Sequence, residues 1–70
     1  MYDREKDPRK IGLDYLELAV RTRAILDNAG LGTLGAILLF GRHRMSKQRG
    51  CGPAVLRNIE VVCNDHGYGF

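Results

Sequence analysis

The sequence predicts a small all-α domain, a compact bundle of four to five short helices with an extended N-terminal lead-in. Apolar residues recur at steps of three and four along three segments, as in helices that bury one face. Glycines separate these segments where corners are expected. The length of 70 residues allows one domain, and a hydrophobic content of 44% suffices for a small globular core.

The N-terminal part of the chain divides into an arm and a lead-in. Residues 1–11 are expected to form a flexible charged arm, because they mix both charge signs and contain a proline. The folded domain is expected over residues 12–70. Its first residues alternate, with Leu16, Leu18 and Val20 on one side, and this alternation predicts an extended segment.

The first helix is expected to begin at Val20 and to run for two to three turns. Arg21 and Arg23 fall on its more polar side. Asn28 and Gly30 are expected to end it, with Gly30 in the left-handed conformation that glycine adopts readily. The apolar side of this helix is expected to comprise Val20, Ala24, Ile25, Leu26 and Ala29.

The middle of the chain predicts two shorter helical segments. Thr33 can cap the first of them by accepting a hydrogen bond from a backbone N–H one turn on, and Gly41 ends it. Residues 42–48 predict a weaker helical turn that carries Met45 inward. The buried face of the first segment is expected to comprise Leu34, Ile37 and Leu38.

The last helix is expected over residues 53–65. Pro53 suits its first position, where the missing N–H costs nothing. Cys63 is expected to pack as a small hydrophobic residue. The two rings of the C-terminal tail are expected to fold back on the domain. The apolar positions of this helix are Val55, Leu56, Ile59, Val62 and Cys63.

The charges are unevenly distributed along the chain, although the net charge is only +3. No acidic residue lies between Asp27 and Glu60. Such asymmetry predicts either a basic binding face or an ordinary solvated surface. The basic residues of the interval are Arg42, Arg44, Lys47, Arg49 and Arg57.

The cysteines and histidines argue against a secreted protein, a zinc site and an enzyme. Cys51 and Cys63 are expected to be free thiols in the cytoplasm, because the N-terminus lacks a signal-peptide pattern and no apolar run suggests a membrane span. With His43 and His66 they match no paired-ligand zinc spacing, so no metal is expected. Neither histidine has a nucleophile or carboxylate at a telling spacing. We therefore expect neither a cofactor nor an enzyme.

The stretch RGCG before Pro53 predicts a tight turn that opens the last helix. The unpaired N–H groups at a helix start, together with the helix dipole, form an anion site, for which a phosphate diester is a natural ligand. Lys47 and Arg49 add positive charge nearby. An ordinary helix–helix turn, with glycines for steric reasons alone, is the alternative interpretation. Because Pro53 lacks an N–H, the backbone donors of this corner are expected at Gly52, Ala54 and Val55.

Three stretches resemble the C-terminal domain of the bacterial RNA polymerase alpha subunit, which has a helix-hairpin-helix type of fold. They are LELAVRTRAIL, NAGLGTLGAIL and RGCGPAVLRNIE, in the family's order and spacing. The resemblance covers about residues 12–70 and is gapless from Leu16 to Gly52. The chain is similar to a stand-alone or divergent relative of that family.

The resemblance implies a DNA-binding module of the transcription machinery that contacts the minor groove of AT-rich DNA and the phosphate backbone. Arg21 matches the family's principal DNA-contacting arginine, and Gly52 matches the hairpin glycine whose backbone meets phosphate. Glu17 matches an acidic position used toward sigma factor or activators, and Asp14 is expected to assist it. The full set of candidate DNA-binding residues is Arg21, Arg23, Lys47, Arg49, Gly50, Gly52, Ala54, Val55 and Arg57.

The implied partners are double-stranded DNA and RNA polymerase, sigma factor or a transcription activator, at the nucleoid of a bacterial cytoplasm. The domain itself is expected to be a monomer. The chain departs from the family at several positions, with Ala24 for a polar asparagine, 53–55 for lysine and serine, Asn58 for an acid and Ala19 for a capping hydroxyl. A protein-interaction module, with DNA binding weakened or lost, is therefore the alternative function.

Overall fold

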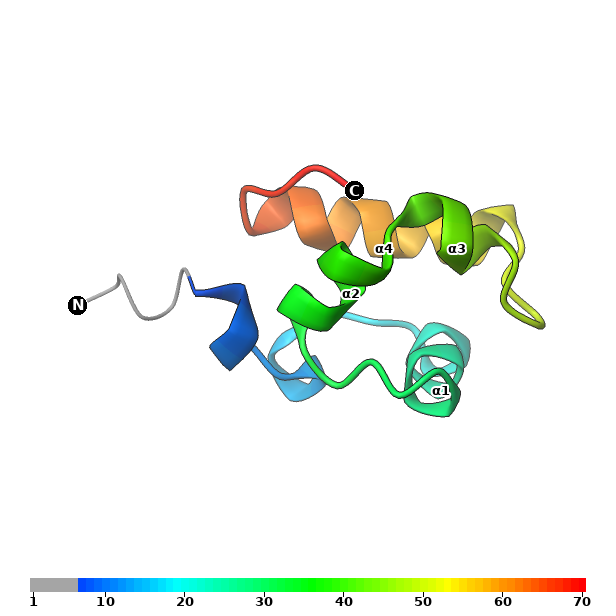
Figure 1. The fold of residues 1–70 in the computed structure, drawn as a ribbon, viewed down its shortest axis with the longest axis horizontal. Helices are drawn as coiled ribbons and strands as arrows, with labels where there is room; N and C mark the ends of the chain where they lie inside the picture. The colour runs from blue at the N-terminus through cyan, green and yellow to red at the C-terminus, as the bar shows by residue number, and fades with distance from the viewer. Residues whose placement is uncertain (1–6) are drawn as a thin grey trace.

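The structure of this chain is a computed structural model that describes residues 7–70 (Figure 1). These residues form an all-α bundle, as the sequence predicts, and they contain no β-strand beyond one isolated antiparallel bridge between Gly12 and Thr33. Two short 3-10 segments precede four α-helices. In chain order the elements are η2 (Pro8–Lys10), η3 (Leu13–Tyr15), α1 (Val20–Asn28), α2 (Leu34–Phe40), α3 (Arg42–Ser46) and α4 (Pro53–Asp65).

The helix α4 has the predicted bounds, with Pro53 at its first position and Gly52 as its N-cap. Its 13 residues make it the longest helix of the described part. No helix there has the length and apolar character that crossing a bilayer requires. In Figure 1 the C-terminal tail folds back along α4, where the Tyr68 N–H donates to the Cys63 carbonyl at 2.9 Å. The predicted return of the tail is thus confirmed.

The ends of the other helices also follow their sequence signals. Gly30, one residue past the C-cap of α1, has φ 76°, so the left-handed ending is confirmed. The Thr33 hydroxyl accepts a hydrogen bond from the Ala36 N–H at 3.1 Å and caps α2. Gly41, with φ 87°, ends α2 and opens α3. The predicted helix ends are therefore set by glycine conformations and by a side-chain cap within one turn of each end.

The buried side of α1 differs from the one predicted. Val20 is 88% exposed and Ala24 is exposed as well, whereas Thr22 is buried with the neighbouring Ile25 and Leu26. Residues 20 and 24 lie one turn apart on the solvent side of α1. They were predicted to be buried because they are hydrophobic, but hydrophobicity alone does not decide which side of a helix packs against the core.

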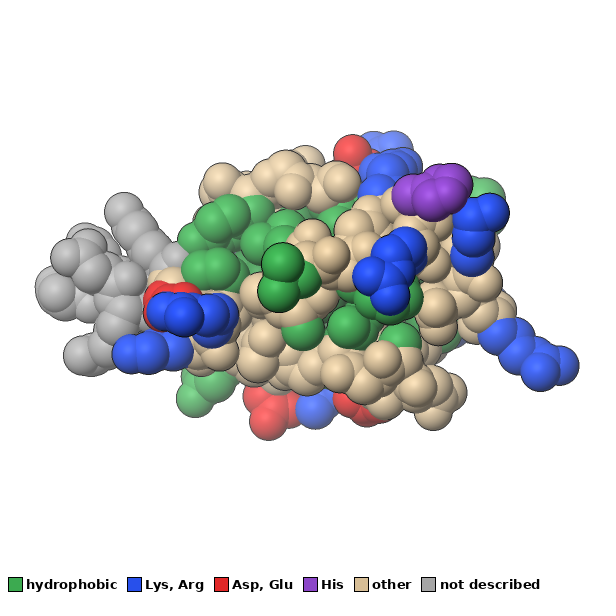
Figure 2. Space-filling view, in the orientation of Figure 1, with side chains coloured by type: hydrophobic (Ala, Val, Ile, Leu, Met, Phe, Trp, Pro, Cys, Tyr) green, Lys and Arg blue, Asp and Glu red, His purple; other side chains and the backbone are tan. Residues whose placement is uncertain are grey.

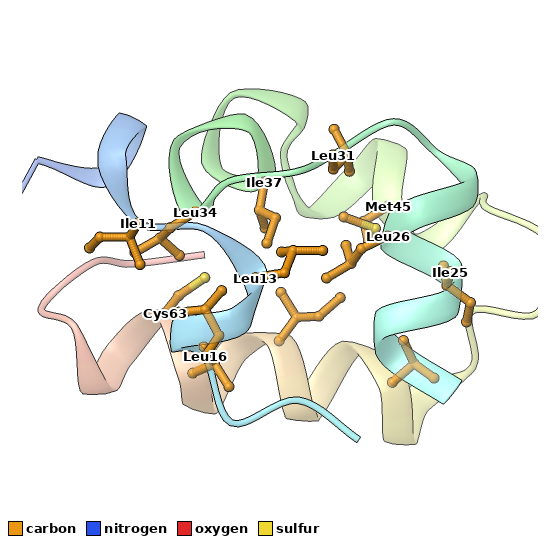
Figure 3. Packing of buried hydrophobic residues seen from close by; sticks show 13 residues of the cluster. Ile11, Leu13, Leu16, Ile25, Leu26, Leu31, Leu34, Ile37, Met45 and Cys63 are labelled. Carbon is orange, nitrogen blue, oxygen red and sulfur yellow. The ribbon is translucent and has the colours of Figure 1, made fainter. Parts of the chain in front are cut away.

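The core lies between the helices and is almost entirely aliphatic (Figure 3). Met45 and Cys63 are fully buried within it, as predicted, and burial raises the pKa of the Cys63 thiol to about 11. Leu38 and Leu56 pack against its edge. The buried hydrophobic residues are Ile11, Leu13, Leu16, Ile25, Leu26, Leu31, Leu34, Ile37, Met45, Val55, Ile59, Val62 and Cys63.

The lead-in is extended only over its second half. Residues 13–15 form η3, and residues 16–19 then run extended into α1. The end of the expected arm is part of the fold, because Ile11 is 7% exposed and its carbonyl accepts from the Leu34 N–H at 2.9 Å. Residues 1–6 of the expected arm lie outside the described residues.

The segment η2 packs against α2 at Gly35. A Cβ at Gly35 would lie 3.2 Å from the backbone of Pro8 and from the Arg9 nitrogen. Such a contact is too close for backbone atoms to accept without a shift. Glycine at this position therefore allows the chain before Ile11 to lie directly on α2 (Figure 1).

Replacing Gly35 with alanine is expected to displace η2 while α2 persists, since alanine favours a helix over glycine by roughly 1 kcal/mol. The measurement is the change in backbone amide NMR shifts of residues 8–11. Gly32→Ala is the control, because a Cβ at Gly32 meets nothing within 4 Å. Equal shifts in the two variants would contradict the close packing at Gly35.

Candidate nucleic-acid interface

The turn between α3 and α4, residues 47–52, is shaped by its backbone, and we call it the hairpin. Gly50 has φ 81°, a conformation that side chains disfavour, and the Cys51 N–H donates to the Gln48 carbonyl at 3.0 Å. Gly52 then returns to an extended conformation with φ −91° and ψ −175°. The hairpin thus delivers the chain directly into the first turn of α4.

The N-terminal end of α4 presents unpaired backbone donors. Pro53 has no N–H, and among the described residues the N–H groups of Gly52, Ala54 and Val55 find no acceptor. No side chain caps this end, and no acidic residue lies in the first turn. These N–H groups and the dipole of a 13-residue helix favour an anion there.

The structure brings the hairpin against α1. A Cβ at Gly50 would lie 3.9 Å from the Ile25 Cδ1 atom, so the backbone of Gly50 faces Ile25. Arg21 lies one turn before Ile25, about 40° around the helix at about 100° per residue. Figure 1 shows α1 and the hairpin on the same end of the molecule. Arg21 is exposed, and on the helical wheel it lies close to Ile25, the α1 residue that Gly50 faces.

Four of the five cations predicted for this interface are unpaired within the described residues. Lys47, Arg49 and Arg57 are exposed and form no ion pair with any of residues 7–70, and the same holds for Arg21. Outside the predicted set, Arg42 pairs with Glu60 at 3.6 Å. Figure 2 shows Lys and Arg side chains at the end of the molecule that carries α3 and the hairpin, and others at the opposite end, where an acidic side chain lies beside them.

Arg23 does not join the other candidate DNA-binding residues. It lies about 200° around α1 from Arg21, on the opposite flank of the buried Thr22. Its guanidinium contacts the Asp14 carboxylate at 2.6 Å and the Asp27 carboxylate at 3.8 Å. Arg23 therefore ties η3 to α1, and Asp14 serves as its partner.

The hairpin and first turn of α4 offer backbone rather than side chains. Val55 is 5% exposed, so its side chain lies in the core, and Ala54 is exposed but apolar. Cys51 is half-buried, and desolvation raises the pKa of its thiol. Gly52 has an ordinary negative φ, and a Cβ there would meet nothing within 4 Å. The fold itself therefore does not require glycine at this position.

A second feature lies on another part of the surface, between η3 and the C-terminal end of α4. It is an open groove of about 280 Å³. Glu17, which the sequence singled out, lies in its wall. The other lining residues were missed: no local pattern marks Tyr15, and about 45 or more residues separate the three lining residues of the C-terminal part from Glu17. The groove is lined by Tyr15, Glu17, Val62, Asp65 and His66.

The groove has an acidic and aromatic character. Two carboxylates, of Glu17 and Asp65, lie beside the C-terminal end of α4, whose dipole is also negative. The ring of Tyr15 is 77% exposed and can lie against a cation. Val62, 4% exposed, adds an apolar wall. The arrangement suits a cationic side chain with an aliphatic stem.

No group of three or more His, Cys, Asp or Glu side chains among residues 7–70 is arranged to hold a metal ion. The candidate interface offers backbone donors and arginine and lysine side chains.

Comparisons of the chain with protein-family models, with curated proteins and with solved structures found no match in any of the three.

Proposed function

We propose that this domain binds double-stranded DNA, with Arg21 in the minor groove of AT-rich sequence and the hairpin and first turn of α4 against the phosphate backbone. It would act as a module of the transcription machinery, in the manner of the family it resembles. The observation that carries the proposal is that Gly50 faces Ile25, since a Cβ at Gly50 would lie 3.9 Å from the Ile25 Cδ1 atom. This packing supports an arrangement in which Arg21, exposed one turn before Ile25, and the unpaired donors after Gly50 bind one DNA duplex.

Electrostatics support the same face. An arginine gains from the enhanced negative potential of a narrow minor groove, while backbone N–H groups at a helix start suit phosphate oxygens. Lys47, Arg49 and Arg57 supply unpaired charge in the hairpin and in α4. Each phosphate neutralised releases counterions, so the affinity must fall as salt rises.

Gly52 supports a close approach by a ligand. Neither its φ nor its surroundings require glycine, yet it stands at the head of the helix with the unpaired donors. A side chain there would occupy the space in front of those donors. Close approach of another backbone is one of the uses that glycine serves.

Arg21→Ala is expected to weaken binding of an AT-rich duplex by roughly 5- to 100-fold, the usual range for one lost specific contact. The measurement is the dissociation constant by fluorescence anisotropy at two salt concentrations. In parallel, the amides of Arg21, Gly52, Ala54 and Val55 should shift in NMR spectra as duplex is added.

Arg9→Ala is the matched control, since Arg9 lies in η2 and pairs with Asp7. It removes the same charge at a site away from the interface and should cost little. Binding by the Arg21 variant as tight as that of the parent, or a parent spectrum that duplex leaves unchanged at low salt, would refute the proposal.

Gly52→Ala is expected to lower the free energy of unfolding by no more than about 1 kcal/mol, because the new methyl group enters open space but alanine is a poorer N-cap than glycine. DNA affinity should nevertheless fall several-fold, since the new methyl group stands between α4 and a phosphate. Chemical denaturation and duplex titration of the same sample measure both quantities. Gly32→Ala, also in open space, serves as the control. Unchanged affinity for Gly52→Ala would exclude close backbone contact here.

The acidic groove favours a second function, a protein-interaction module that binds RNA polymerase, sigma factor or a regulator with DNA binding weakened or lost. Its carboxylates at Glu17 and Asp65 and the exposed Tyr15 ring fit a basic side chain of a partner. The apolar chemistry of Pro53 to Val55, which offers no polar side chain to phosphate, favours the same function.

An arginine-containing peptide is expected to shift the amides that line the groove, with saturation in the millimolar range expected of one exposed contact. Glu17→Gln should weaken that binding by roughly 2- to 5-fold, as for a partly exposed ion pair. NMR titration measures both effects, and Asp27→Asn, outside the groove, is the matched charge control. A peptide with citrulline in place of arginine should leave the spectrum unchanged; equal binding of the two peptides would argue against a cation site.

A further inference from the structure

We propose that Asn58 is a positioning residue for Arg21: its side-chain amide fixes the start of α1 against α4 and so holds Arg21 in register with the donors at the head of α4. The proposal rests on the DNA-binding function above and assigns a role to a residue outside the candidate set. Asn58 touches no DNA in this arrangement and acts through Arg21.

The geometry consists of two hydrogen bonds between segments far apart in the chain. The Asn58 Oδ1 atom accepts from the Ala19 N–H at 3.0 Å. The Asn58 Nδ2 group donates to the Glu17 carbonyl at 3.5 Å. One side chain of α4 therefore bonds to both Glu17 and Ala19 in the short segment that leads into α1.

This segment has few other restraints. Ala19 is the N-cap of α1 but has no side-chain group with which to cap it. Between residues 16 and 19 the described backbone makes one local bond, from the Leu18 N–H to the Leu16 carbonyl at 2.9 Å. Leu16 anchors the beginning of the segment in the core. The clamp by Asn58 fixes its other end.

The chemistry of the clamp requires an amide. The Ala19 N–H needs an acceptor and the Glu17 carbonyl needs a donor, and only an amide side chain of this length offers both. A carboxylate would keep the acceptor and lose the donor. Aspartate at this position should therefore retain the shorter bond, whereas alanine loses both.

The same helix connects the clamp with the candidate phosphate site. Asn58 lies five residues after Pro53, about 7.5 Å along α4 at 1.5 Å per residue. Arg21 lies two residues after Ala19, inside the first turn of α1. Since α4 carries both the clamp and the unpaired N–H groups, the clamp sets the distance between Arg21 and those groups.

The test is a double-mutant cycle on AT-rich duplex affinity with Asn58→Ala, Arg21→Ala and the double variant. Asn58→Ala is expected to weaken binding about fivefold, the equivalent of one neutral hydrogen bond, and to have no further effect in the Arg21→Ala background. Asn64→Ala, an exposed asparagine of the same helix, is the control and should bind as the parent does. An equal loss with and without Arg21 would overturn the proposal.

The clamp has its own readout in the absence of DNA. Exchange of the Ala19 amide hydrogen should be slow in the parent and in Asn58→Asp, and fast in Asn58→Ala. The affinity of Asn58→Asp for the duplex should also equal that of Asn64→Asp, which adds the same charge. Fast exchange of Ala19 in the parent, or an Asn58→Asp variant as weak as Asn58→Ala, would overturn the proposal even if all variants are folded.

Failure of the positioning role and failure of DNA binding are distinguishable. If the parent binds duplex and Asn58→Ala binds it equally well, only the positioning role is overturned. If the parent itself does not bind, the proposed function is overturned and the role of Asn58 in it falls as well. Slow exchange of Ala19 would then report a purely structural clamp.

Discussion

The packing of α1 against α4 and its preceding hairpin is the constraint on which the candidate interface depends. An exposed arginine on a short helix and a glycine turn thirty residues later are each unremarkable surface features. In the proposed interface they form one surface, because Gly50 faces Ile25 and so orients α1 relative to the hairpin. A rotation of α1 by half a turn would present Arg23 there instead, together with its acidic partners.

The surface charges divide in a way that follows from the fold rather than from composition. Unpaired cations lie in the hairpin, in α4 and on the Arg21 flank of α1, while Asp14 and Asp27 hold Arg23 on the other flank. These ion pairs are largely exposed, so they contribute little to the free energy of unfolding. Burial of the aliphatic core contributes most of the stabilising free energy. The ion pairs instead decide which arginines are left to bind an anion.

Local signals in the sequence predicted the helix boundaries well, because caps and glycine corners depend on neighbouring residues alone. Thr33, Gly41 and Pro53 each mark a boundary through chemistry that acts within one turn. The buried face of α1 was harder to predict, since Val20 is as hydrophobic as a core residue and yet is exposed. Thr22 is buried instead, because segments distant in the chain pack on the side of α1 that carries Thr22.

Local sequence patterns are enough to predict the all-α class, the extent of α4, the hairpin and the residues proposed to bind phosphate there, since each follows from backbone preferences within a few residues. The packing of the helices alone determines that Gly50 faces Ile25, that Asp14 and Asp27 hold Arg23, and that Glu17 shares a groove with Asp65 and His66. It also determines that Asn58 clamps the start of α1. These relations join residues far apart in the chain, and their geometry is set by how the helices pack around a common core, which no local pattern records.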